Sequence, residues 1–133
     1  MTKKRVSSSY KRSRTGKACL ATKRWALVGG SFVAIHCWPE APESERYLRS
    51  QHRHMFEVRI QIEVFHADRE IEYYNFKKQL QIFLMLMPKY LTSSCEMYCD
   101  IIATMIKAKY PKRDLVVKVL EDGMEGAVCE YAL

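Results

Sequence analysis

Residues 55–64, MFEVRIQIEV, alternate between apolar and polar side chains over ten positions. Successive side chains of a β-strand point to opposite faces of its sheet, so this period of two predicts a strand with one buried face. The side chains expected on the buried face are Phe56, Val58, Ile60, Ile62 and Val64. The rest of the fold is predicted outward from this strand.

A partner strand is predicted on the N-terminal side, at residues 26–37. This segment is rich in β-branched and aromatic residues and ends at the loop-forming sequence WPEAP, residues 38–42. The connection between the two strands, residues 38–51, is long and polar and contains prolines. Long loops in compact domains often carry function, so we expect a functional site beside this connection.

Two helices are predicted after the central strand. Apolar residues at helical spacing predict the first helix between Asn75, a possible N-cap, and Pro88. The second is expected to begin at one of the hydroxyl residues 92–94 and to end before residues 110–111.

Strands at residues 115–121 and 127–131, joined by a turn at Asp122-Gly123, complete the order β-β-α-α-β-β. Two hairpins separated by a helical pair predict an α+β fold in which an antiparallel sheet carries both helices on one face.

The net charge of +7 is unevenly distributed. Residues 1–24 hold nine Lys and Arg and no acid, whereas residues 25–133 hold thirteen Lys and Arg and all fifteen Asp and Glu. The chain is therefore expected to consist of a disordered basic tail, 1–24, and a folded domain, 25–133. The tail could be simply solvated, could contact nucleic acid or another acidic partner, or could direct import into an organelle.

The sequence argues against membrane insertion and against secretion. The longest uncharged stretch, residues 25–38, is shorter than the roughly 20 apolar residues of a membrane-spanning helix. The five cysteines are scattered without a C-x-x-C pair, and no apolar run follows the first basic cluster. We therefore expect reduced thiols in an intracellular compartment, the cytoplasm unless the tail directs organelle import.

Three histidines flank the long loop. His36 ends the first predicted strand, and His52 and His54 begin the second. Residues two apart on a strand share a face, so His52 and His54 can converge on one ion, and His36 can add a third nitrogen if the strands are neighbours. Three imidazoles with an open fourth position are typical of catalytic zinc. The alternative is a polar strand edge that binds no metal, in an α+β domain with a purely structural role.

Two sequence motifs occur in order around the histidines: F-x-A-x-H at 32–36 and H-x-H-x-F-x-V at 52–58. Together with looser matches at 75–80, at 94–97 and at 117–131, they resemble the signatures of the 6-pyruvoyltetrahydropterin and 6-carboxytetrahydropterin synthase family, which has a V-x-V-x-E-T hairpin at the last of these positions. The resemblance covers roughly residues 30–132 and leaves the tail outside.

The resemblance implies the tunnelling fold, in which β-β-α-α-β-β units associate into a barrel as trimers or hexamers with sites between subunits. It also implies lyase activity on dihydroneopterin triphosphate or a related intermediate of pterin or queuosine biosynthesis. By position, it assigns His36, His52 and His54 to zinc, Glu121 to the pterin ring, and Glu96 and Cys95 to the neighbourhood of that ring.

The departures from the family concern proton transfer. Leu48 stands where the family has its catalytic cysteine, and residues 85–91 lack the family's Asp-His pair. Cys37 and Cys95 are the candidate replacements, and the thiol of Cys95 is expected to have a lowered pKa at a helix N-terminus. Two functions remain open: a zinc-dependent synthase with rearranged acid–base groups, or a non-catalytic protein that binds a pterin-like or purine-like ligand, or that contacts nucleic acid or a larger assembly through its tail.

Overall fold

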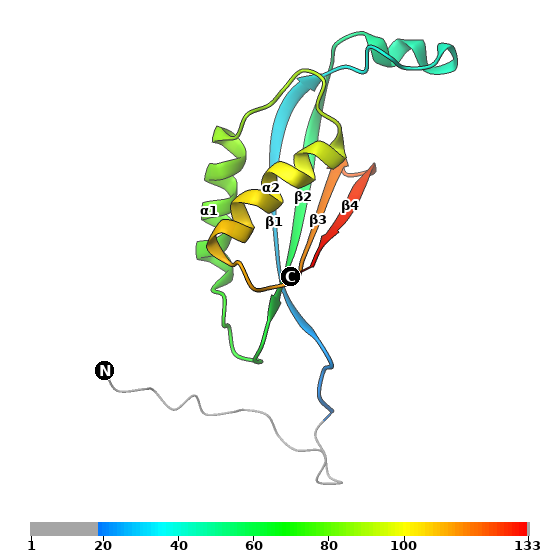
Figure 1. Cartoon of the computed structure of the whole chain (residues 1–133). Coiled ribbons are helices and arrows are strands. Elements are labelled where there is room, and N and C mark those ends of the chain that lie inside the picture. The colour runs from blue at the N-terminus through cyan, green and yellow to red at the C-terminus, as the bar shows by residue number, and fades with distance from the viewer. Residues whose placement is uncertain (1–18, 133) are drawn as a thin grey trace.

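Four strands form one antiparallel sheet in the order β1-β2-β3-β4 (Figure 1). The structure, a computed structural model, describes residues 19–132. The long strands β1 and β2 pair along their whole length, and β3 and β4 form the second hairpin. The elements are β1 (Arg24–His36), β2 (His52–Val64), α1 (Tyr73–Leu86), α2 (Cys95–Lys109), β3 (Leu115–Glu121) and β4 (Glu125–Tyr131), with a short 3-10 helix, η1 (Glu43–Arg49), between β1 and β2.

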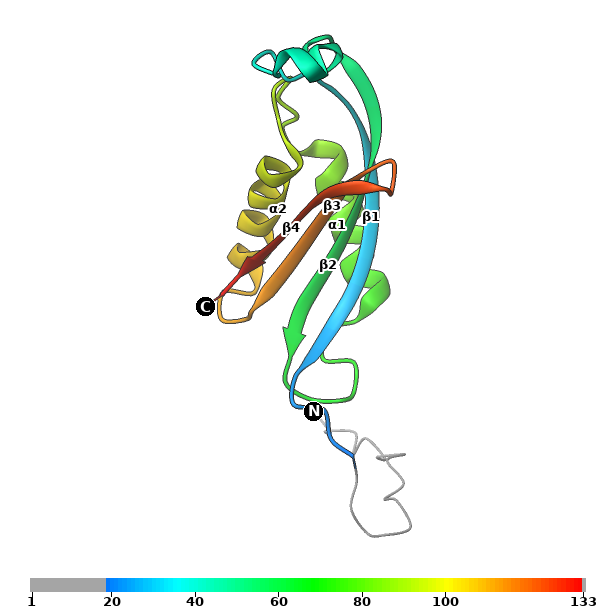
Figure 2. The same cartoon turned by 90° about the vertical axis from the view of Figure 1, so that its right-hand side faces the viewer.

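Both helices cover the same face of the sheet, and Figures 1 and 2 show the other face uncovered. The register pairs Phe32 with Phe56, so these two rings point to one side. Tyr98 of α2 packs on both of them, with ring centroids 4.9 and 5.1 Å away. A Cβ on Gly30 would lie 2.8 Å from Leu84 of α1, so α1 also packs on this face. The predicted α+β order and the helix-covered antiparallel sheet are confirmed.

The core lies between the sheet and the two helices. Its side chains come from alternate positions of every strand, as the period of two in β2 predicts. Burying such side chains is the dominant favourable contribution to folding. The largest fully buried ones are Tyr98, Phe56, Ile60, Ile62, Leu80, Leu84, Ile102, Ile106, Leu115, Val58, Val117 and Val119.

The first helix begins earlier than predicted. Glu72, not Asn75, is its N-cap, because the Glu72 carboxylate accepts hydrogen bonds from the backbone N–H groups of Tyr74 and Asn75. The apolar pattern starts only at Phe76 and gives no sign of the preceding polar turn. The predicted N-cap of the second helix is confirmed, since Ser94 accepts a hydrogen bond from the Met97 N–H.

The tail lies mostly outside the described residues, which begin at residue 19. Arg24, placed in the tail by its charge, opens β1 opposite Val64. Lys23 forms ion pairs with Asp114 at 2.5 Å and Glu63 at 3.5 Å. The predicted disorder and the partners of residues 1–18 therefore stay predictions.

The long connection contains η1, which was not predicted, and it extends past the end of the sheet (Figure 2). η1 has no buried residue, so its sequence lacks an apolar pattern. The base of the connection is held by two backbone hydrogen bonds: the Cys37 N–H donates to the Leu91 carbonyl at 2.8 Å, and the Trp38 N–H donates to the Leu48 carbonyl at 2.7 Å. The loop is therefore anchored next to the end of β1.

The predicted Asp122-Gly123 turn is confirmed. Asp122 has φ 53° and Gly123 has φ 74°, the pair of positive values that a tight type I′ hairpin requires. The Met124 N–H donates to the Glu121 carbonyl at 3.0 Å and closes the turn. As a result, Glu121 and Asp122 lie at the same end of the sheet as the three histidines.

No helix among residues 19–132 is both long enough and apolar enough to pass through a lipid bilayer.

Candidate metal centre and adjoining cavity

The three histidines meet at one end of the helix-covered face. The register places His36 directly opposite His52 and Ala34 opposite His54, so the three imidazoles project from the same side as Phe56. One ring nitrogen of each can be chosen so that all three nitrogens lie within 4.8 Å of one another. The predicted convergence is confirmed, and this cluster is close enough to hold a metal ion.

Each imidazole has its Nδ1 atom next to an oxygen. A neutral imidazole carries a proton on one nitrogen and a lone pair on the other, so an acceptor at Nδ1 leaves Nε2 available for an ion. Metal-binding histidines are commonly oriented by such a second partner. The pairs are His36 with the Ser93 carbonyl at 2.8 Å, His52 with the Ser50 carbonyl at 2.8 Å, and His54 with the Asp122 carboxylate at 2.7 Å.

The environment of the His36 Nε2 atom indicates whether the site fits a metal. It is buried and makes no hydrogen bond to any residue between 19 and 132, although a Glu121 carboxylate oxygen lies 3.4 Å away, within ion-pair distance if the ring were protonated. A buried polar atom without a partner is costly, and most such atoms in folded proteins are satisfied. A metal ion held with His52 and His54 would satisfy it, so the residues present fit a three-histidine centre.

Glu121 lies beside this centre at the end of β3. Its register partner is Phe56, which places the carboxylate on the same face as the histidines. One oxygen is 3.4 Å from His36 Nε2, and the other is 3.5 Å from His54 Nε2. The first oxygen is also 4.0 Å from the Cys95 sulfur, so Glu121 stands between the histidines and the start of α2.

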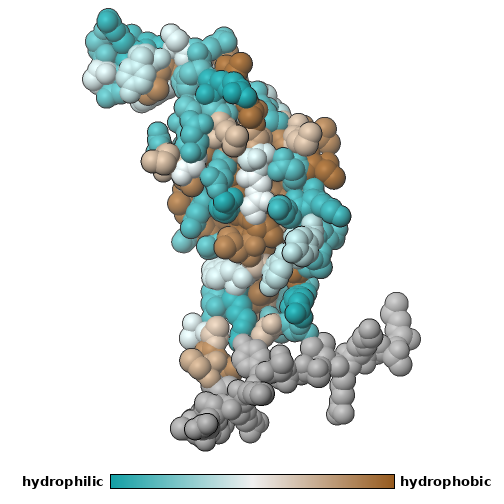
Figure 3. All heavy atoms as spheres, turned by 180° about the vertical axis from the view of Figure 1, so that it is seen from behind, coloured by the Kyte–Doolittle hydropathy of each residue, from teal (hydrophilic) through white to brown (hydrophobic). Residues whose placement is uncertain are grey.

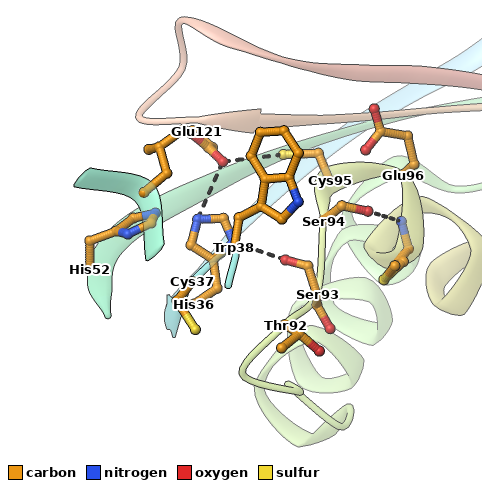
Figure 4. A pocket seen from close by; sticks show the side chains of 12 residues that line it. His36, Cys37, Trp38, His52, Thr92, Ser93, Ser94, Cys95, Glu96 and Glu121 are labelled. Carbon is orange, nitrogen blue, oxygen red and sulfur yellow. Dashed lines mark hydrogen bonds and ion pairs between the residues drawn. The ribbon is translucent and has the colours of Figure 1, made fainter. Parts of the chain in front are cut away.

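A cavity of about 400 Å³ adjoins the centre (Figure 4). This volume is within the usual range for small-molecule sites. It brings together the predicted residues Glu121, Glu96, Cys95 and Cys37 with two of the histidines. The lining residues are His36, Cys37, Trp38, Leu48, His52, Thr92, Ser93, Ser94, Cys95, Glu96, Met97 and Glu121.

The predicted lowering of the Cys95 pKa is wrong. Burial raises the pKa of this thiol to about 12, and the nearby carboxylates of Glu121, Glu96 and Glu125 raise it further. The effect of the helix N-terminus is outweighed because the sulfur is removed from water among negative charges. Cys37 has a different problem as a base, since its sulfur points away from Glu121 in Figure 4.

We expect Cys95 to resist alkylation at neutral pH. A thiol with a pKa of about 12 holds almost no reactive thiolate at pH 7.5, and its labelling should rise only as the pH approaches 12. Iodoacetamide labelling followed by peptide mass spectrometry measures this directly, with the exposed Cys19 as the reactive reference. Equal labelling of the two cysteines at pH 7.5 would show that the Cys95 thiol is ionised after all.

Asp122 is a site residue that the sequence reading missed. Its hydrogen bond with His54 and a second one from the Met55 N–H hold the pKa of this carboxyl below its usual range. A charged acceptor at Nδ1 makes Nε2 a better donor of its lone pair to a metal ion, and it fixes the orientation of the ring.

Replacing Asp122 with asparagine is expected to weaken zinc binding by roughly 10-fold or more, in the range usual for loss of an outer-shell carboxylate. Asparagine can still adopt the positive φ of this turn position, so the hairpin should persist. Asp68→Asn is the matched control, because the half-buried Asp68 carboxylate pairs with Arg69 and does not contact the histidine cluster. Identical zinc affinities for the Asp122→Asn variant and the unmodified chain would remove Asp122 from the centre.

A scan against protein-family models finds no match to this chain, and a search of curated proteins finds no significant match.

Proposed function

We propose that the chain binds zinc through His36, His52 and His54 and accepts a pterin or a related heterocycle in the adjoining cavity, as the resemblance to the tetrahydropterin synthases implies. The observation that carries this proposal is the orientation of the imidazoles: every Nδ1 faces an oxygen, which leaves three Nε2 atoms for one ion. Three histidines and an open position are characteristic of zinc that acts on a substrate.

The residues around the ion have separate tasks in this proposal. Bound zinc would polarise a carbonyl or hydroxyl group of the substrate. Glu121 can accept two parallel N–H bonds, from the 2-amino group and the adjacent ring N3–H of a pterin, which is the geometry that a carboxylate recognises best. Asp122 and the carbonyls of Ser50 and Ser93 orient the imidazoles.

A non-catalytic binding protein is the second candidate, and one observation favours it. Leu48, which cannot accept a proton, lines the cavity where the family resemblance calls for a cysteine. The raised pKa of Cys95 makes that residue a poor substitute at neutral pH. Under this reading the chain keeps the metal and the heterocycle site but releases its ligand unchanged.

One experiment separates the two candidates. Purified full-length chain is analysed for zinc and, in the same preparation, for elimination of triphosphate from dihydroneopterin triphosphate. About one zinc per chain with turnover supports the enzyme. Zinc with binding of the pterin but no turnover supports the binding protein, and absence of zinc after incubation with zinc salt contradicts both.

We also propose that several copies of the chain assemble through the uncovered face and the edge strands of the sheet. Figure 3 shows hydrophobic side chains among polar ones on this face. β1 and β4 are the edges, and such strands present unpaired backbone groups. Apolar residues exposed on this face are Leu27, Val33, Ile35, Met55 and Val128.

A trimer or hexamer is the expected state, as the family resemblance implies. Light scattering coupled to size-exclusion chromatography should give three or six times the mass of one chain. Val33→Lys, in an exposed position of β1, should shift that mass downward because it places a charge on the apolar face. A single-chain mass for the unmodified protein at micromolar concentration would contradict the assembly.

A further inference from the structure

Trp38 belongs neither to the histidine cluster nor to the hydrophobic core. It follows His36 and Cys37 at the end of β1, and its indole lines the cavity that Glu121 and Cys95 also line (Figure 4). About half of its surface, 51%, is exposed. A large aromatic side chain left half uncovered above a cavity is available to bind a ligand.

The backbone around Trp38 is held in place. Its N–H donates to the Leu48 carbonyl at 2.7 Å, and its carbonyl accepts from the Ala41 N–H at 3.1 Å. The preceding N–H, of Cys37, donates to the Leu91 carbonyl at 2.8 Å. These bonds fix the point from which the indole projects, so little backbone order has to be gained when a ligand binds.

Nothing within residues 19–132 already serves as the stacking partner of the indole. The ring pairs of the core and of the histidine cluster do not include Trp38, and no Lys or Arg lies over its ring in this part of the chain. By contrast, Trp25, the other tryptophan, has the Lys23 ammonium 4.7 Å above its ring and does not line the cavity. Of the two tryptophans, therefore, only Trp38 presents to the cavity a ring that no described aromatic ring or cation covers.

The cavity combines two recognition features that suit one class of ligand. Glu121 offers two acceptor oxygens for a donor edge, and Trp38 offers a flat apolar face. A planar 2-amino-oxo heterocycle, whose amino group and adjacent ring N–H form a donor edge, can use both at once, because in-plane hydrogen bonds leave its face free for stacking.

We propose that Trp38 is the stacking residue that holds a planar 2-amino-oxo heterocycle while Glu121 accepts its donor edge. This inference rests on the proposed function and adds to it a specificity-determining residue outside the metal centre. Pterins and guanine derivatives share this edge, so both are suitable probes.

The test uses zinc-loaded full-length chain titrated with neopterin and, separately, with guanosine. Trp38→Leu keeps an apolar side chain but removes the aromatic face, and Trp38→Phe keeps a smaller face. Trp25→Phe is the matched control. We expect Trp38→Leu to weaken binding about 10- to 100-fold, the usual loss for one stacked base, and both phenylalanine variants to stay within a few-fold of the unmodified chain.

A spectroscopic measurement separates stacking from a general disturbance of the loop. Stacking should lower the near-ultraviolet absorbance of bound neopterin, and this change should vanish in Trp38→Leu at saturating ligand while the zinc content stays the same. Equal affinity and equal absorbance change in Trp38→Leu would overturn the inference alone. If the unmodified chain binds neither probe, the proposed heterocycle site fails together with the inference.

Discussion

Replacing His52 with alanine is expected to lower the zinc affinity of the chain by roughly 100-fold or more. The substitution removes one of the three imidazoles that we propose hold the ion, and each ligand of a zinc site contributes several kcal/mol to binding. His52 is partly exposed at the start of β2 and its ring contacts the rings of His36 and His54, so the sheet should persist without it. Competition with a chromogenic chelator measures the affinity.

His66→Ala is the matched control for this variant. His66 is exposed in the turn after β2, where it lies 3.7 Å from Glu70, and it is not part of the histidine cluster. Its removal should leave zinc affinity unchanged. If the two variants bind zinc equally well, the ion is held somewhere other than at His36, His52 and His54.

Phe56→Ala is expected to lower the free energy of unfolding by about 3–5 kcal/mol, the cost typical of removing a buried phenylalanine. Phe56 is fully buried where the core meets the histidine cluster. Its ring is stacked on Phe32 at 5.0 Å and lies 5.1 Å from Tyr98. The His36 ring stands perpendicular to it, with the ring centroids 5.2 Å apart. The variant should therefore lose zinc affinity as well as stability.

Urea unfolding followed by circular dichroism measures the stability of this variant, and chelator competition measures its zinc affinity. Phe65→Ala is the control, since Phe65 is 63% exposed and its ring lies 5.0 Å from the Arg113 guanidinium. It should cost about 1 kcal/mol or less. A Phe56→Ala variant as stable as the Phe65→Ala variant would contradict the packing between core and centre.

Helices and strands could be predicted from the sequence wherever apolar residues recur along one face of the element. The alternation at 55–64 gave β2, and helical spacing gave α1 and α2. Elements without an apolar face were missed: η1 buries no residue, and the start of α1 depends on the Glu72 carboxylate rather than on hydrophobic periodicity. Local hydrogen bonds of this kind leave no periodic signal in a sequence.

At the candidate site, too, features that follow from residue spacing could be predicted, and features that depend on local contacts could not. The shared face of His52 and His54 follows from a spacing of two, and the register of β1 and β2 adds His36. Two of the Nδ1 partners are backbone carbonyls, of Ser50 and Ser93, which any residue type supplies. No sequence pattern could therefore identify them. The Cys95 pKa depends on burial among carboxylates, which only the packed structure reveals.

Zinc-edge X-ray absorption of the zinc-loaded full-length chain tests the central claim most directly. We predict three imidazole nitrogens at about 2.0–2.1 Å from the ion and no sulfur at about 2.3 Å, because the cysteines near the site do not join the histidine cluster. The imidazole signal should be lost from the His52→Ala variant at equal zinc supply. A spectrum with sulfur ligands, or one that His52→Ala leaves unchanged, would contradict a metal centre built on His36, His52 and His54.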